Sequence, residues 1–157
     1  MRITRMLAMF AAVAVVGSCS DSSTGIPTGL EVYTATLNGA NEAPTAVTTT
    51  ATGHAVVTVL GDSVVSWEVI IDSPIDSITL GHIHRRAADS VFGNVQVNFA
   101  PPARGVGFTG TATIGSSAPA GAADSIFAIM RAGRAYVNIH TKKNPNGEIR
   151  GTLVRVQ

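Results

Sequence analysis

The amino-acid sequence predicts an all-β fold, an antiparallel β-sandwich or barrel of about eight strands with one short helix. Apolar residues make up 45% of the 157-residue chain and charged residues only 13%, a balance that suits short strands better than long charged helices. The apolar and β-branched residues also occur in short alternating runs separated by turn residues, as in strands with one buried face. The expected strands are residues 31–37, 55–60, 64–71, 77–84, 92–99, 106–114, 135–141 and 149–156.

Turn residues predict how neighbouring strands pair. Gly61 and Asp62 separate the second and third runs and form a two-residue hairpin signal. Residues 144–147, Asn-Pro-Asn-Gly, separate the last two runs. We therefore expect both pairs of strands to be antiparallel neighbours, and we expect the Thr-rich residues 45–52 to form a loop.

One segment has a helical period. Residues 124–132 carry apolar side chains three and four positions apart, with Asp124 as the expected N-cap and Gly133 as the expected stop. We expect this helix to pack across a sheet edge or an end of the barrel.

The N-terminus has the layout of an export signal. Arg2 and Arg5 form a basic start, residues 6–16 are apolar, and small residues precede Cys19. This stretch resembles the lipobox of bacterial lipoproteins, which implies that Cys19 is lipidated. Cys19 is the single cysteine, so the chain forms no internal disulfide. The alternative is ordinary signal cleavage with an incidental thiol.

These features divide the chain into a lipoprotein signal peptide at residues 1–18, a lipidated cysteine with a flexible tether at 19–29, and one domain at 30–157. The tether is rich in Ser, Thr, Gly and Pro, and it cannot bury enough apolar surface to fold. We expect an exported protein of the cell envelope, anchored in the membrane through lipid, with Ser20 favouring the outer membrane. Eleven Lys and Arg against ten Asp and Glu leave no charge excess for a nucleic-acid partner.

The histidines are the strongest chemical signal. His82 and His84 are two positions apart in one expected strand, and His140 lies two positions after Asn138 in another. Because strand side chains alternate, each pair shares a face opposite apolar neighbours, outside the core or at its rim. Three such imidazoles could bind copper or zinc and leave one coordination position open. The alternative is an exposed polar face whose histidines bond to Asn138, Asp89 or water.

Other polar residues have weaker candidate roles. Glu148 and Arg150 share a face of the last strand, where they form an ion pair or, with Asn138, orient the histidines. Arg85 and Arg86 either lower the imidazole pKa values by repulsion or form a solvated loop. The fourth histidine, His54, is expected on the surface, with a fourth ligand position as the alternative.

Motifs that carry catalysis are not found. The sequence has no Gly-x-Ser-x-Gly elbow, no phosphate-binding glycine loop with lysine and no cysteine nucleophile in the expected domain. It therefore favours a non-enzymatic module that binds a protein or a metal ion, and it assigns no catalytic residue.

Several motifs together resemble the CHRD (chordin-type) domain family. Residues 37–44, Leu-Asn-Gly-Ala-Asn-Glu-Ala-Pro, resemble the opening of that domain, followed by the Thr-rich approach to a glycine at 48–53. The His-Ile-His motif at 82–84 resembles its centre, and residues 135–141 with 144–151 resemble its end. This resemblance implies an immunoglobulin-like β-sandwich or barrel and an exported location, but it implies little about activity.

A weaker likeness is to copper/zinc superoxide dismutases, β-barrels that also place a His-x-His strand at a metal. This chain lacks their disulfide and their zinc cluster, so only a mononuclear site is conceivable. A redox metalloenzyme with His82, His84 and His140 as ligands is therefore the alternative to the binding module. A structural envelope component whose histidines have no function is a third hypothesis.

Overall fold

The computed structural model describes residues 29–60, 64–75, 77–86, 89–113 and 122–157. The predicted signal peptide, Cys19 and the predicted tether up to residue 28 lie outside the described residues, as does the hairpin turn at 61–63. Among the described residues, no helix has the length and apolar character needed to cross a membrane.

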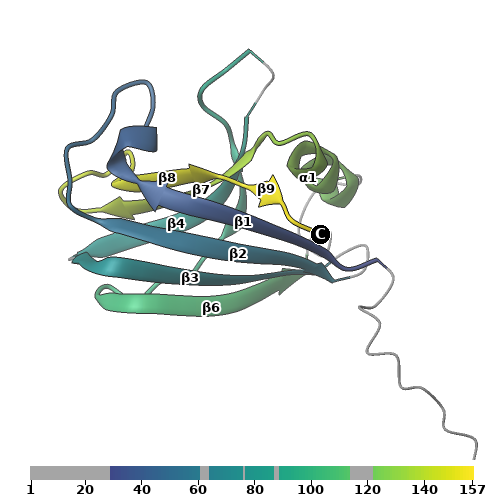
Figure 1. Cartoon of the computed structure of the whole chain (residues 1–157), viewed down its shortest axis with the longest axis horizontal. Helices are drawn as coiled ribbons and strands as arrows, with labels where there is room; N and C mark the ends of the chain where they lie inside the picture. Colours follow the sequence, from purple (N-terminus) through teal and green to yellow (C-terminus); the bar gives the residue numbers. More distant parts are fainter. Residues whose placement is uncertain (1–28, 61–63, 76, 87–88, 114–121) are drawn as a thin grey trace, which may run out of the picture.

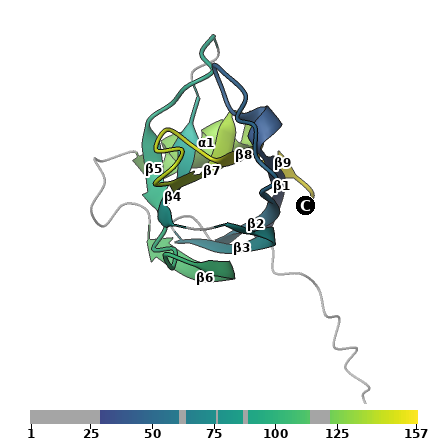
Figure 2. The same cartoon turned by 90° about the vertical axis from the view of Figure 1, so that its left-hand side faces the viewer.

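The described chain is an all-β structure, as predicted. Its strands form one antiparallel sheet in the order β5-β4-β7-β8-β1-β2-β3-β6, with β9 paired to β1, and this sheet curls into a nearly closed barrel (Figures 1 and 2). The strands are β1 (Glu31–Asn38), β2 (Thr52–Leu60), β3 (Val64–Ile75), β4 (Ile78–Arg85), β5 (Val95–Asn98), β6 (Gly105–Thr113), β7 (Ala135–Thr141), β8 (Ile149–Thr152) and β9 (Val154–Arg155).

The core lies inside the barrel and follows from alternation along the strands. In β1 and β2, every second residue is buried, and these inward side chains are mostly apolar. The predicted antiparallel pairs are confirmed: β2 pairs with β3 from Gly53↔Ile71 to Leu60↔Val64, and β7 pairs with β8. Fully buried side chains from both halves of the chain meet here: Tyr33, Leu37, Val57, Val65, Val69, Ile83, Ile139 and Ile149.

Two strands differ from the prediction. The single strand expected at 149–156 is two strands, because the chain changes partner at Leu153: β8 pairs with β7 and β9 pairs with β1. The strand expected at 92–99 begins only at Val95, because Phe92 and Gly93 belong to the loop before it and the ladder with β4 shifts at His84.

The predicted helix is present as α1 (Ala122–Arg131), and the structure has in addition a short 3-10 helix, η1 (Gly39–Asn41), after β1. The expected N-cap at Asp124 is wrong, since α1 begins two residues earlier. The expected stop is confirmed: Gly133 has φ 65°, a left-handed conformation that favours glycine at a helix end. Ile126, Phe127 and Met130 are buried in the core, and α1 lies at one end of the barrel (Figure 1).

Candidate functional site

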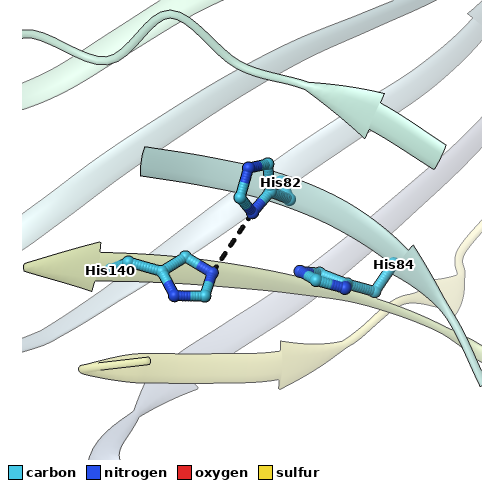
Figure 3. Close-up of side chains that lie close together, drawn as sticks. All are labelled: His82, His84 and His140. Atoms are coloured by element: carbon cyan, nitrogen blue, oxygen red, sulfur yellow. Dashed lines mark hydrogen bonds between the residues drawn. The ribbon is translucent and has the colours of Figure 1, made fainter. Parts of the chain in front are cut away.

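The three predicted histidines lie together on the outer face of two neighbouring strands. β4 and β7 pair antiparallel, with His82 opposite Asn138 and His84 opposite Tyr136. Alternation directs Ile83 and the apolar residues of β7 into the core and the imidazoles away from it, as predicted. Figure 3 shows His82 and His84 on β4 facing the same side as His140 on β7.

The histidine face is buried, which the sequence did not predict. His82, His84 and His140 are only 7%, 9% and 8% exposed. The alternative of an exposed polar face is therefore wrong. The reason lies in the loops, because the backbone of Gly93 and that of Pro145 reach over the face and contact the imidazoles directly.

These backbone contacts determine how the imidazoles present their nitrogens. His84 Nδ1 lies 2.9 Å from the carbonyl oxygen of Gly93, and His140 Nδ1 lies 3.0 Å from that of Pro145. Since a carbonyl oxygen only accepts, both Nδ1 atoms carry the proton and both Nε2 atoms keep a lone pair. His84 Nε2 is buried and has no hydrogen-bond partner among the described residues. Metal-binding histidines typically have such a tautomer, in which the ring nitrogen that does not bind the metal donates its N–H to a carbonyl or carboxylate oxygen.

The nitrogens converge at a distance suitable for a metal ion. His82 Nδ1 lies 3.2 Å from His140 Nε2 (Figure 3), and ligand atoms of the three histidines all lie within 4.8 Å of one another. Nitrogens bound at roughly 2.0 to 2.1 Å to a tetrahedral ion are about 3.3 Å apart. The His82 and His140 nitrogens already have this spacing, so only His84 would need to move closer.

Burial keeps the three imidazoles neutral. Burial, together with smaller contributions from the neighbouring His140 and His84, lowers the pKa of His82 to about 4. The same cause lowers the pKa of His84 and that of His140. Of the two alternatives for Arg85 and Arg86, repulsion of the imidazoles is not needed, because burial is the main cause and neither arginine contributes to these shifts. Neutral imidazole is the form that binds metal ions.

Arg150 and Tyr136 flank the histidines. The Tyr136 ring stacks on His84 with a centroid distance of 4.9 Å, and the Arg150 guanidinium carbon lies 3.6 Å from the Tyr136 centroid. Asn138 is buried on β7, where it lies opposite His82 of β4 and Arg150 of β8. The structure therefore brings two of the three predicted supporting residues, Asn138 and Arg150, to the face of the histidines.

Glu148 and His54 lie elsewhere. The Glu148 carboxylate accepts hydrogen bonds from Thr141, Thr49 and Asn144, and so ties two loops together. The ion pair expected between Glu148 and Arg150 is not among those that the described residues form. His54 lies on the surface near Asp72, as expected, with 3.4 Å between His54 Nδ1 and the nearer carboxylate oxygen.

Sequence reasoning missed Glu42. This residue follows η1 and is 8% exposed, and its Oε2 accepts a hydrogen bond of 3.4 Å from Asn138 Nδ2. Burial raises the pKa of Glu42 to about 7. Glu42 belongs to the motif at 37–44, but no spacing rule connects that motif to β7.

A hollow of about 440 Å³ opens beside the histidines. His84, His140, Asn138 and Arg150 line its polar side. Exposed Phe92 lies on its wall. A small molecule in this hollow would contact the two imidazoles whose Nε2 atoms carry lone pairs.

Comparison with known proteins identifies one family. The model of the CHRD domain matches residues 33–153, which include every strand that carries the site. No curated protein and no solved structure shows significant similarity to the chain.

Proposed function

The chain belongs to the CHRD domain family, and we propose that it is an exported, lipid-anchored binding module whose ligand is a copper or zinc ion held by His82, His84 and His140. The observation that carries this proposal is the convergence of three buried, neutral imidazoles whose ligand atoms lie within 4.8 Å of one another. Family membership supports a binding module in general.

The donor set fits these two metals. Imidazole nitrogen suits zinc and copper, whereas calcium and magnesium require oxygen ligands. Two of the three imidazoles are oriented by backbone carbonyls, so little conformational freedom is lost on binding. His82 would bind through Nδ1, which means that its proton would move to Nε2. Copper(II) is expected to bind more tightly than zinc at such a site.

Metal content tests the proposal. The full chain, purified in detergent without an affinity tag of histidines, is dialysed against copper or zinc and analysed for metal. We expect close to one ion per chain, lost in the His82→Ala/His140→Ala double variant.

The matched control is His54→Ala, which removes a surface imidazole away from the site and should keep the metal. Circular dichroism checks that both variants are folded. Metal content that is equal in the double variant and the control would refute the site, and so would a wild-type chain without metal.

A redox metalloenzyme is the second candidate. The hollow beside His84 and His140 favours it, because a small molecule could reach an open coordination position there. Superoxide or peroxide turnover by the copper-loaded chain, lost in His82→Ala, would support this function. If the copper-loaded chain shows no turnover, the binding module remains the proposed function.

Export and anchoring rest on the sequence at Cys19. If Cys19 is lipidated, cells grown with a labelled fatty acid will incorporate the label into the wild-type chain and not into Cys19→Ser. Release of the Cys19→Ser protein from the membrane fraction is the second expected result. Unlabelled wild-type protein would refute the anchor and leave the metal site unaffected.

A further inference from the structure

A second hollow lies on the same outer face, on the other side of Arg150. Its volume is about 500 Å³, and Arg150 and Arg86 both line it. Thr34 and Thr36 of β1 alternate with buried residues and so face outward, and Thr152 follows Arg150 on the same face of β8. All three threonines line this hollow. Its walls therefore combine two guanidinium groups with hydroxyl groups.

Arg150 is a buried cation without a carboxylate partner. It is 7% exposed, and its Nη2 donates a hydrogen bond of 2.7 Å to the carbonyl oxygen of Val91. None of the ion pairs that the described residues form includes Arg150. Glu42 attracts it electrostatically, but the Glu42 carboxylate bonds to Asn138 instead. Because a charge of low solvent exposure is stabilised by a counter-ion, an anion beside this guanidinium would stabilise it further than the Val91 carbonyl oxygen and the Tyr136 ring do.

Arg86 adds a second positive charge beside this hollow. Its backbone N–H donates to the carbonyl oxygen of Arg134, which fixes the chain where β4 ends. Its charge repels that of Arg150 and contributes to lowering the pKa of Arg150, although burial is the larger cause. An anion between these two like charges would relieve their repulsion.

We propose that this hollow binds a small oxyanion, a carboxylate or a phosphate, between the guanidinium groups of Arg86 and Arg150. Guanidinium groups bind both oxyanions through paired, charge-assisted hydrogen bonds. The threonine hydroxyls can donate to the remaining oxygens. The proposal does not rest on the metal site, because none of the three histidines lines this hollow, although Arg150 also lines the hollow beside them.

Calorimetric titration of the full chain in detergent, without added metal, tests the site. The probes are inorganic phosphate and succinate in a buffer that contains no other oxyanion. We expect one saturable site for at least one probe, with affinity reduced about tenfold or more in Arg86→Gln, since charge-assisted hydrogen bonds are the strong ones. Binding of phosphate alone identifies a phosphate site, and binding of succinate alone identifies a carboxylate site.

The matched control is Lys142→Gln, which removes one positive charge from an exposed position after β7. It should leave the affinity unchanged, because Lys142 does not line this hollow. Arg86 is half-buried and away from the core, so the Arg86→Gln variant should fold. Arg150→Lys keeps the positive charge but lacks the planar guanidinium group, and so tests whether that group is needed. No saturable binding of either probe up to about 10 mM, or equal weakening in Lys142→Gln, would overturn the proposal.

Discussion

Replacement of His82 by Gln should flatten the pH dependence of stability. The imidazole of His82 has a pKa of about 4 in the folded protein because it is buried beside two other histidines. In the unfolded chain, the pKa of histidine is about 6.5. The unfolded state therefore binds more protons between these two values, and stability falls as the pH falls from about 6.5 to about 4.

The size of the effect follows from the two pKa values. Between pH 7 and pH 5, the His82 contribution to the free energy of unfolding falls by about 2 kcal/mol, and the loss approaches about 3 kcal/mol below pH 4. Glu42 titrates in the same range with the opposite sign, because burial raises its pKa to about 7. The comparison of wild type with His82→Gln isolates the histidine, since Glu42 is present in both.

Urea unfolding of the metal-free protein at pH 7 and pH 5, with a chelator present, measures this difference. From pH 7 to pH 5, the free energy of unfolding of wild type should fall by about 2 kcal/mol more than that of His82→Gln. His54→Gln is the control, because His54 lies on the surface, and it should behave as wild type. Equal pH dependence in wild type and His82→Gln would refute the reasoning, since it would mean that His82 is protonated equally in the folded and unfolded states.

Two further changes test other parts of the structure. Glu42→Gln should make stability rise more steeply with pH than in wild type between about 4.5 and about 7, by up to about 3 kcal/mol, because the raised pKa of Glu42 opposes the rise that His82 causes. Urea unfolding across this range measures the difference, and equal pH dependence in the two proteins would contradict the raised pKa of Glu42. Gly110→Ala should destabilise the fold by about 1 to 3 kcal/mol, because a Cβ at Gly110 would lie 2.4 Å from Trp67 Cζ2. Thermal unfolding followed by Trp67 fluorescence measures the loss of stability. A variant as stable as wild type would contradict the tight contact between β3 and β6.

The barrel could be predicted from local patterns because each strand carries its own signal. Alternation in β1 and β2 fixes which side chains face inward, whatever strand lies beside them. The same rule placed His82, His84 and His140 opposite the core. It could not determine that these histidines are buried, because their burial comes from the loops that carry Gly93 and Pro145. Loop paths depend on tertiary contacts and leave no periodic signal.

Contacts between distant parts of the chain were also beyond prediction. Glu42 and Asn138 are 96 residues apart, and they meet because Asn38 at the end of β1 lies opposite Arg150 of β8, which in turn lies opposite Asn138. These pairings depend on the order of the strands in the sheet, which a single sequence does not reveal. The same limit applies to Glu148: the sequence allowed it a role near the histidines, but it precedes β8 and its carboxylate bonds to Thr49, Thr141 and Asn144 instead.

The distribution of unsatisfied polar atoms supports the proposed ligand-binding role of the outer face. Among the described residues, four buried side-chain atoms have no hydrogen-bond partner, and three of them belong to Glu42, His84 and Asn138. Each such atom costs about 1 to 3 kcal/mol, and native structures have few of them. His84 and Asn138 line the hollow beside the histidines, and Glu42 is bonded to Asn138. A fold that needed only stability would place apolar side chains at these positions, so this polar cluster is an argument for the binding role proposed above.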